Sequence, residues 1–223
     1  MDGKLFGRAI AKFAGGVVLL GLLLFLPAGT LRWRQGWLLM GILFVPMFAA
    51  GLVMLRKSPA LLEKRLNAKE EQGEQRRVIL LSGLMFLAAF VTAGLNFRFR
   101  WIVLPEAVSW IAAAVFLLGY ALYAEVLREN VWLSRTVEVQ ENQRVVDTGL
   151  YGVVRHPMYM STLLLFLAMP LVLGSVISFV ITLAYVPIIA RRIRNEEAVL
   201  EAGLAGYAAY KRKIRWKVIP FVW

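Results

Sequence analysis

The sequence predicts an all-α integral membrane protein with about four transmembrane helices, followed by a transmembrane helical hairpin and an amphipathic cytoplasmic C-terminal helix. Hydrophobic residues make up 60% of the 223 residues, and the mean hydropathy is +0.66. Soluble domains carry roughly 45–50% apolar residues. The 26 lysines and arginines flank the apolar runs instead of forming one basic stripe. These two observations favour a membrane-spanning protein and argue against a nucleic-acid-binding one.

Four apolar runs predict the first four membrane spans, since a transmembrane helix needs about 20 predominantly apolar residues. They cover approximately residues 13–26, 37–55, 78–95 and 107–127. The first run could instead be a signal peptide cleaved near Ala28, but its positive flanks favour a retained span. The polar segment 56–77 joins the second and third spans, and its part Pro59–Leu66 predicts a short interfacial helix.

The apolar stretch from Met158 to Ala190 predicts a tight helical hairpin. Its 33 residues are too many for one span and few for two, and Gly174-Ser175 breaks the run near its middle. With the N-terminus in the cytoplasm and a hairpin here, the cytoplasmic segments carry 22 lysines and arginines, and the external segments carry 4. This positive-inside bias predicts a multi-pass protein with both termini in the cytoplasm.

Two segments outside the apolar runs complete the predicted architecture. Residues 128–156 leave the membrane, and the alternation in 136–140 and 144–149 predicts two short strands that close a small cap. The tail from Arg191 predicts a cytoplasmic helix whose basic residues meet anionic headgroups. The apolar face of this helix consists of Leu200, Leu204, Tyr207, Ile214 and Val218.

The composition also excludes several kinds of site. Without a cysteine, the chain has no disulfide, no thiolate nucleophile and no cysteine-bound metal. It has one histidine, His156, which argues against a histidine-based metal site. We therefore predict no metal ligand.

The stretch from Asp147 to Ser161 is the main candidate for a functional site. It holds His156 between Arg155 and Pro157, at the point where the apolar hairpin begins. Proline suits the first position of a helix, and a helix N-terminus offers unpaired N–H groups and partial positive charge. The hairpin brings this point to the same membrane surface as the polar residues that follow its second arm. These are Arg191, Arg192, Glu196 and Glu197.

The spacing of these residues resembles one family of membrane enzymes. Gly149-Leu150-Tyr151 precedes Arg155-His156-Pro157-Met158-Tyr159, and Glu196-Glu197 with Leu200 follows about forty residues later. This arrangement resembles the isoprenylcysteine carboxyl methyltransferases and their relatives, the phospholipid methyltransferases. The resemblance covers roughly residues 120 to 220. It implies N-terminal transmembrane helices over 1–127 and a methyltransferase-like, cofactor-binding region over 128–223.

The resemblance implies S-adenosylmethionine as the cofactor and assigns roles to nine residues. Arg155, Arg192 and Glu197 are expected nearest the methyl acceptor, as catalytic residues. The expected cofactor-binding residues are Gly149, Tyr151, His156, Pro157, Tyr159 and Glu196. Their chemistry suits that cofactor. His156 and the helix start could bind its carboxylate, and Glu196 could bind its ammonium or ribose. Tyr159 could face its sulfonium.

The sequence does not identify the methyl acceptor. The expected partners are membrane lipids and an amphiphilic substrate, with the carboxylate of a prenylcysteine-like molecule as the first choice. A phospholipid amine is the alternative, and it would need a base such as Glu197 to remove a proton. The Arg-His-Pro-x-Tyr pattern also resembles NADPH-dependent membrane sterol reductases. A small transporter or non-catalytic membrane component is a further alternative. The absence of charged midplane residues and inverted repeats in the predicted spans argues against it.

Overall fold

The computed structural model describes residues 3–67, 73–133 and 136–223, which form helices and loops with no strand. The helices are α1 (Gly3–Ala28), α2 (Arg34–Lys57), α3 (Pro59–Asn67), α4 (Gly73–Phe99), α5 (Glu106–Glu129), η1 (Gly149–Gly152), α6 (Pro157–Val172), α7 (Val176–Thr182), α8 (Tyr185–Gly203) and α9 (Tyr207–Lys213). Among the described residues, five stretches are long and apolar enough to cross a membrane. The predicted all-α membrane architecture is therefore confirmed.

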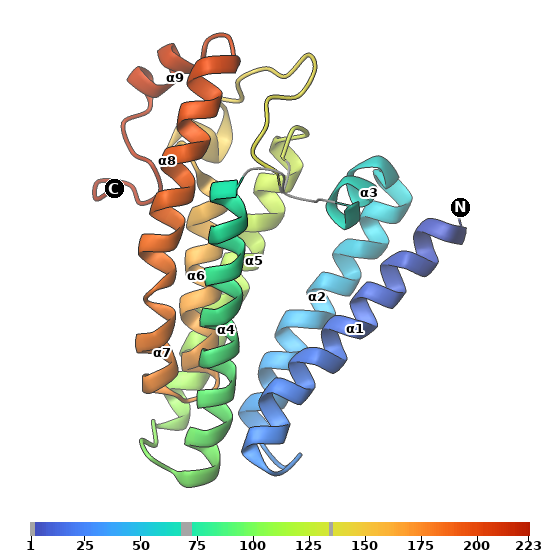
Figure 1. Ribbon diagram of the computed structural model, residues 1–223, viewed down its shortest axis with the longest axis vertical. Helices are drawn as coiled ribbons and strands as arrows, with labels where there is room; N and C mark the ends of the chain where they lie inside the picture. The colour runs from blue at the N-terminus through green and yellow to red at the C-terminus, as the bar shows by residue number, and fades with distance from the viewer. Residues whose placement is uncertain (1–2, 68–72, 134–135) are drawn as a thin grey trace.

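The long helices run side by side along the longest axis of the molecule (Figure 1). Helices α1 and α2 form one pair, and α4 to α8 form the other part of the bundle. An apolar cluster that includes Leu24, Leu39 and Phe116 joins α1 and α2 to α5 and α6. A second cluster, with Tyr159, Tyr185 and Ile193 at its centre, packs α6 against α8. This second cluster sets the distance between the two helices that carry most of the candidate site.

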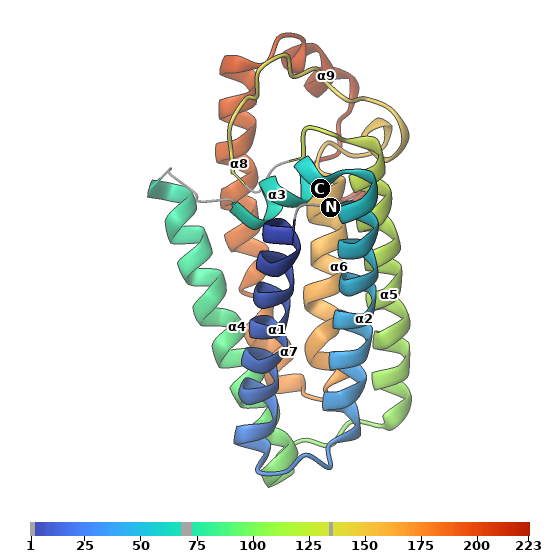
Figure 2. The same cartoon turned by 90° about the vertical axis from the view of Figure 1, so that its right-hand side faces the viewer.

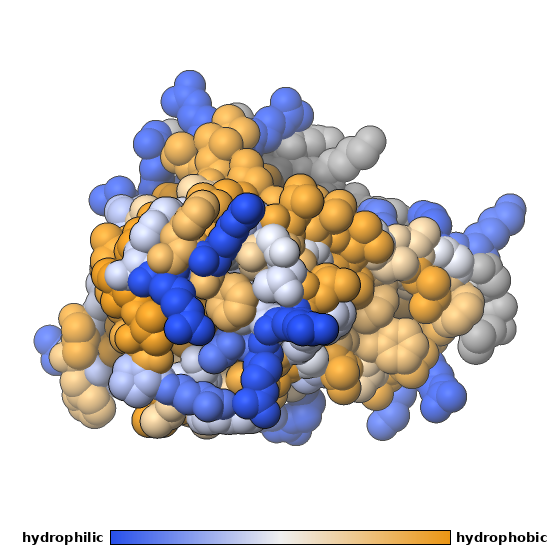
Figure 3. Space-filling model, turned by 90° about the horizontal axis from the view of Figure 1, so that it is seen from below, coloured by the Kyte–Doolittle hydropathy of each residue, from blue (hydrophilic) through white to orange (hydrophobic). Residues whose placement is uncertain are grey.

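The loops and termini divide between the two ends of the bundle. Both termini, α3 and α9 lie at one end, and the connections after α1, α4 and α6 lie at the other (Figures 1 and 2). Viewed from below, hydrophobic side chains cover much of the molecule, with hydrophilic ones among them and around the rim (Figure 3). The short helix predicted over Pro59–Leu66 is confirmed as α3, and an ion pair of 3.1 Å between Arg8 and Glu63 ties it to α1.

The predicted hairpin is also confirmed. Helix α6 ends at Val172, and a turn at Gly174 reverses the chain. Ser175 caps the second arm by accepting a hydrogen bond of 3.3 Å from the Ser178 amide. The Ser178 hydroxyl in turn donates to the carbonyl of Ala89 at 2.8 Å, which fixes the turn against α4. The second arm consists of α7 and α8, and the site residues of α8 therefore return to the end where α6 begins.

The two strands predicted over 136–140 and 144–149 are wrong. This region is a loop, closed by a turn in which the Gln143 amide donates to the Gln140 carbonyl at 3.1 Å. The valines alternate for another reason. Val139 and Val145 pack against the aromatic cluster of α9, whereas the preceding residues Glu138 and Arg144 are exposed. One-sided burial against a helix produces the same pattern as a half-buried strand.

The predicted C-terminal helix ends earlier than its apolar face suggested. Helix α8 stops at Gly203, and α9 begins after Gly206, whose φ of 87° is in the left-handed region that favours glycine. Residues beyond Lys213 are not helical and return toward the start of α6. The amides of Arg155 and His156 donate to the carbonyls of Trp216 and Lys217 at 2.9 and 2.8 Å. We call residues 214–217 the return segment.

We expect single cysteines introduced at Ser58, Thr148 and Ala209 to react with a thiol reagent from one side of the membrane only. All three positions are exposed and belong to the end of the bundle that holds both termini. The chain has no other cysteine, so each signal reports one site. Val103→Cys, in the exposed loop at the other end, is the control and should react only from the opposite side. Labelling of Ala209→Cys together with Val103→Cys would contradict the arrangement.

Candidate active site

A pocket opens where α6, α8 and the 130–146 loop meet, at the end of the bundle that holds both termini. The empty space between its walls is about 830 Å³, including the open mouth. One part of the wall is charged and aromatic, a second part beside α9 is apolar, and the 130–146 loop adds Asn130, Glu138, Gln143 and Arg144. The charged part is lined by Arg155, His156, Tyr159, Arg192 and Glu196.

The start of α6 places the first of these side chains. His156 is the N-cap residue and Pro157 takes the first helical position, as the sequence predicted. The ring of Pro157 is fully buried and does not line the pocket. Tyr159 follows within the first turn, with only 3% of its surface exposed. The helix start therefore aims polar groups at the pocket while its proline faces the protein interior.

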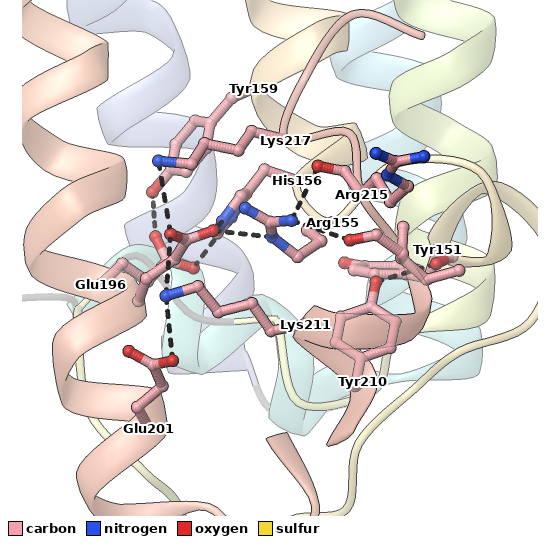
Figure 4. Close-up of polar contacts among 12 residues, drawn as sticks. Tyr151, Arg155, His156, Tyr159, Glu196, Glu201, Tyr210, Lys211, Arg215 and Lys217 are labelled. Carbon is pink, nitrogen blue, oxygen red and sulfur yellow. Dashed lines mark hydrogen bonds and ion pairs between the residues drawn. The ribbon is translucent and has the colours of Figure 1, made fainter. Parts of the chain in front are cut away.

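Glu197 is the centre of a buried ionic cluster, and its partners Arg155, His156, Lys211 and Lys217 are labelled in Figure 4. Its Oε1 accepts hydrogen bonds from Arg155 Nε at 2.8 Å and from His156 Nε2 at 3.1 Å. Because a carboxylate can only accept, His156 Nε2 carries the proton in this contact. The Oε2 atom lies 3.5 Å from Lys217 Nζ and 3.8 Å from Lys211 Nζ. Both oxygens of Glu197 are thus engaged, and its side chain is 5% exposed and outside the pocket lining.

Arg155 connects this cluster to the return segment. Its Nη1 donates to the carbonyl of Ile214 at 2.7 Å and to that of Arg215 at 3.0 Å. Together with the two backbone hydrogen bonds to Trp216 and Lys217, these contacts hold the return segment against the Arg-His-Pro motif. Only 7% of Arg155 is exposed, so most of its hydrogen-bonding capacity serves the protein itself.

Glu196 belongs to a different group, which faces the pocket. The Tyr159 hydroxyl donates to Glu196 Oε2, and Arg192 Nε donates to the Tyr159 oxygen at 3.0 Å. His156 Nδ1 lies 3.9 Å from Glu196 Oε1. One pocket wall therefore presents a carboxylate, a guanidinium and an aromatic ring within a few ångströms of one another.

The 3-10 helix η1 fixes the opposite side of the motif. Gly149 has a φ of 49°, and a Cβ there would overlap the carboxylate of Glu129. That carboxylate accepts a hydrogen bond of 3.1 Å from the Leu150 amide. The Tyr151 hydroxyl accepts one of 2.8 Å from Asn130 Nδ2. Gly149 thus permits a close approach between η1 and the end of α5, and it does not line the pocket.

Tyr207 and Tyr210 complete the apolar wall from α9. The Tyr210 hydroxyl donates to the carbonyl of Tyr151 at 2.8 Å. The Tyr207 hydroxyl is buried and, among the described residues, has no hydrogen-bond partner. Burial raises the pKa of Tyr207, and the nearby carboxylates of Glu197 and Glu196 raise it further. The sequence placed Tyr207 on an apolar face and gave no reason to single out its hydroxyl.

The structure brings all nine predicted site residues to this region. Those that line the pocket are Tyr151, Arg155, His156, Tyr159, Arg192 and Glu196; those that do not are Gly149, Pro157 and Glu197. Their roles toward a ligand stay predictions. Within the described part of the chain, no group of three or more histidine, aspartate or glutamate side chains could hold a metal ion. The return segment and Tyr207 are the parts of the site that the sequence did not indicate.

Part of the chain matches a known protein family. Residues 107–205 match the family model described as phospholipid methyltransferase. The matched region begins in α5 and ends just after α8, so it includes η1, the whole hairpin and Glu196-Glu197. This match confirms the resemblance that the Arg-His-Pro-x-Tyr motif indicates. No curated protein matched the chain.

We expect Glu197→Gln to lower the free energy of unfolding by about 3–5 kcal/mol, because it leaves the buried Arg155 without its partner charge. Glu196→Gln is the matched control. Glu196 is more exposed and its amide replacement can still accept from Tyr159, so stability should change by less than about 1 kcal/mol. Thermal and denaturant unfolding in detergent micelles measures both variants. Equal stability of the two would contradict the assignment of Glu197 to the buried cluster.

Proposed function

We propose, from the match of residues 107–205 to the phospholipid methyltransferase family model, that this membrane protein transfers a methyl group from S-adenosylmethionine to the carboxylate of an amphiphilic acceptor. The observation that carries the proposal is the group formed by Tyr159, Arg192 and Glu196 at the pocket wall. It offers both charge signs and an aromatic ring at the membrane surface. A zwitterionic sulfonium compound and an anionic acceptor require this combination.

The residues present fit the cofactor. Its ammonium group needs an anion, and Glu196 lines the pocket beside Tyr159, whereas Glu138, also in the lining, lies on the 130–146 loop. Its sulfonium is suited to the face of an aromatic ring, and Tyr159 lies beside Glu196. His156 and the start of α6 are the groups proposed for its carboxylate. The buried Tyr207 hydroxyl, which has no partner among the described residues, also marks the pocket as built for a polar ligand.

The cofactor would supply an electrophilic methyl carbon, which an acceptor oxygen attacks as the bond to sulfur breaks and sulfur keeps the electron pair. A carboxylate acceptor is already a nucleophile, so the protein has to align it and exclude water. We assign the alignment to Arg192, whose planar guanidinium can hold a carboxylate through two hydrogen bonds. Arg155 and Glu197, the other predicted catalytic residues, would act mainly by holding His156 and the return segment in place.

The state of Glu197 favours a carboxylate acceptor over an amine. An ammonium group must lose a proton before it can attack, which calls for a base. Glu197 accepts from Arg155 and His156 and has two lysines near its other oxygen, so it is poorly placed to take a proton from a ligand. The second candidate is methylation of a phospholipid amine. The family match supports it, and Glu196 would then be the base.

An apolar groove supports an acceptor with a long hydrocarbon chain. It opens between the α1–α2 pair and α4, with an empty volume of about 1,000 Å³ including its open side. Phe86 and Phe166 line it, and Phe166 packs on Tyr185 with ring centroids 4.9 Å apart. Phe166 follows Tyr159 by two helical turns, or about 10 Å. A chain in this groove would leave its polar head near Arg192.

The same arrangement supports an orientation in the membrane. The pocket opens at the end of the bundle where the positively charged segments gather. We propose that this end is cytoplasmic, in accord with the positive-inside bias. A water-soluble cofactor would then enter from the cytoplasm, and the acceptor would enter sideways from the bilayer.

The detergent-purified protein should bind S-adenosylmethionine and S-adenosylhomocysteine in calorimetry, and it should not bind NADPH. Glu196→Gln should weaken S-adenosylhomocysteine binding roughly tenfold to a hundredfold, as expected for the loss of one charge-assisted contact of about 1.5–3 kcal/mol. Glu201→Gln is the control, because Glu201 lies on the same helix, pairs with Lys211 and does not line the pocket. Binding of NADPH without S-adenosylhomocysteine would reverse the proposal in favour of a reductase.

Arg192→Lys should lower turnover on the order of a hundredfold while S-adenosylhomocysteine affinity stays within about twofold, since lysine keeps the charge but loses the planar fork. Methyl transfer would be followed with prenylcysteine analogues, fatty acids and phospholipids. Arg194→Lys, at an exposed position of the same helix, should have no effect. Transfer to phospholipid amines alone would select the second candidate. A parallel loss of cofactor affinity would make Arg192 a cofactor ligand.

A further inference from the structure

Tyr207 has a feature that the proposed chemistry does not use. It lines the pocket from the start of α9, and only 4% of its surface is exposed. Its hydroxyl oxygen is one of two buried side-chain polar atoms without a hydrogen-bond partner in the part of the chain that the structure describes. The other, Trp33 Nε1, lies in the apolar core at the opposite end of the bundle, far from the pocket. A buried hydroxyl without a partner is costly, which calls for an explanation.

The neighbouring tyrosine shows that the cost is specific to position 207. Tyr210 lies one turn further along α9, and its ring centroid is 5.8 Å from that of Tyr207. Its hydroxyl is satisfied by the carbonyl of Tyr151. Two similar side chains on one helix therefore differ in a single respect. Both line the pocket, but the Tyr210 hydroxyl bonds to the protein and the Tyr207 hydroxyl has no partner among the described residues.

The surroundings of Tyr207 define what could pair with it. The wall beside it is apolar, formed by Leu200, Leu204 and Val145. The pKa of Tyr207 is raised by burial and by the carboxylates of Glu197 and Glu196, so the phenol keeps its proton and acts as a donor at neutral pH. Glu197 is compensated by Arg155 and its other partners, but Glu196 also lines the pocket and makes this position unfavourable for an anionic ligand group. The partner is therefore a neutral acceptor atom on a largely apolar group.

We propose that the Tyr207 hydroxyl donates a hydrogen bond to a ring nitrogen of the purine of the cofactor, and that Tyr207 thereby determines the preference of the pocket for a purine nucleoside. The inference rests on the proposed function, because it assigns the adenine end of S-adenosylmethionine to the apolar wall. The charged wall with Arg192 and Glu196 is left for the amino-acid end. The two ends of the ligand thus match the two parts of the pocket.

This assignment has a consequence for the ligand-free protein. Tyr207→Phe removes a hydroxyl that has no protein partner, so it should not lower the unfolding temperature and can raise it slightly. Tyr210→Phe is the matched control. It removes a hydroxyl that bonds to Tyr151, so it should lower the unfolding temperature.

The experiment measures the affinity of the full-length, detergent-purified chain for S-adenosylhomocysteine and for its 1-deaza, 3-deaza and 7-deaza analogues. Each analogue replaces one ring nitrogen with a C–H group. Tyr207→Phe should bind S-adenosylhomocysteine about tenfold more weakly than the wild type, the loss expected for one buried hydrogen bond. For one of the three analogues, the variant and the wild type should bind equally, because that analogue lacks the acceptor. Tyr210→Phe should show no such dependence on the analogue.

Two results would overturn the inference and leave the proposed function standing. One is wild-type affinity of Tyr207→Phe for S-adenosylhomocysteine. The other is an equal loss for S-adenosylhomocysteine and all three analogues, which would place the hydroxyl on the ribose or on no ligand atom. A wild-type chain that binds none of the four compounds would overturn both proposals.

Discussion

The site depends on one buried carboxylate. The side chain of Glu197 is buried, and an uncompensated buried charge would cost several kcal/mol. It is compensated by Arg155 and His156, which come from a segment about forty residues earlier in the chain. The need to neutralise Glu197 therefore fixes the start of α6 against the middle of α8. The pocket wall formed by Tyr159, Arg192 and Glu196 follows from that fixed relation, since these side chains lie within one turn or so of the buried group.

The two adjacent glutamates have different positions: Glu197 belongs to the buried cluster, and Glu196 lines the pocket. Successive residues of a helix point about 100° apart, so Glu196 and Glu197 cannot both face the pocket. Glu197 points inward and is shared among Arg155, His156 and two lysines. Glu196 points to the pocket and accepts a hydrogen bond from the Tyr159 hydroxyl. A rigid cluster directly behind the pocket wall keeps the ligand-facing groups in position, as a preorganised site requires.

Much of the fold can be predicted from local signals, and much of the site cannot. Pro157 marks the start of the hairpin, and Gly174-Ser175 marks its turn. Both predicted positions agree with the structure, because proline and glycine determine the conformation of their own backbone. The return segment escapes prediction because the spacing of Ile214 and Val218 also fits an amphipathic helix. Sequence spacing likewise cannot tell which of Glu196 and Glu197 turns inward, because that depends on the rotation of α8 against α6. The unpaired hydroxyl of Tyr207 is visible only when its neighbours are known.

The return segment also sets the order in which the site can form during synthesis. A chain that is made from its N-terminus can insert its helices as they emerge, and the hairpin is complete once residue 203 has been added. The amides of Arg155 and His156 and the guanidinium of Arg155, however, obtain their backbone partners only from residues 214–217. Until those residues leave the ribosome, Arg155 and His156 lack the hydrogen bonds that the return segment supplies. A nascent chain can therefore be fully inserted in the bilayer and still be unable to form this pocket, so that membrane insertion and completion of the site are separate events in time.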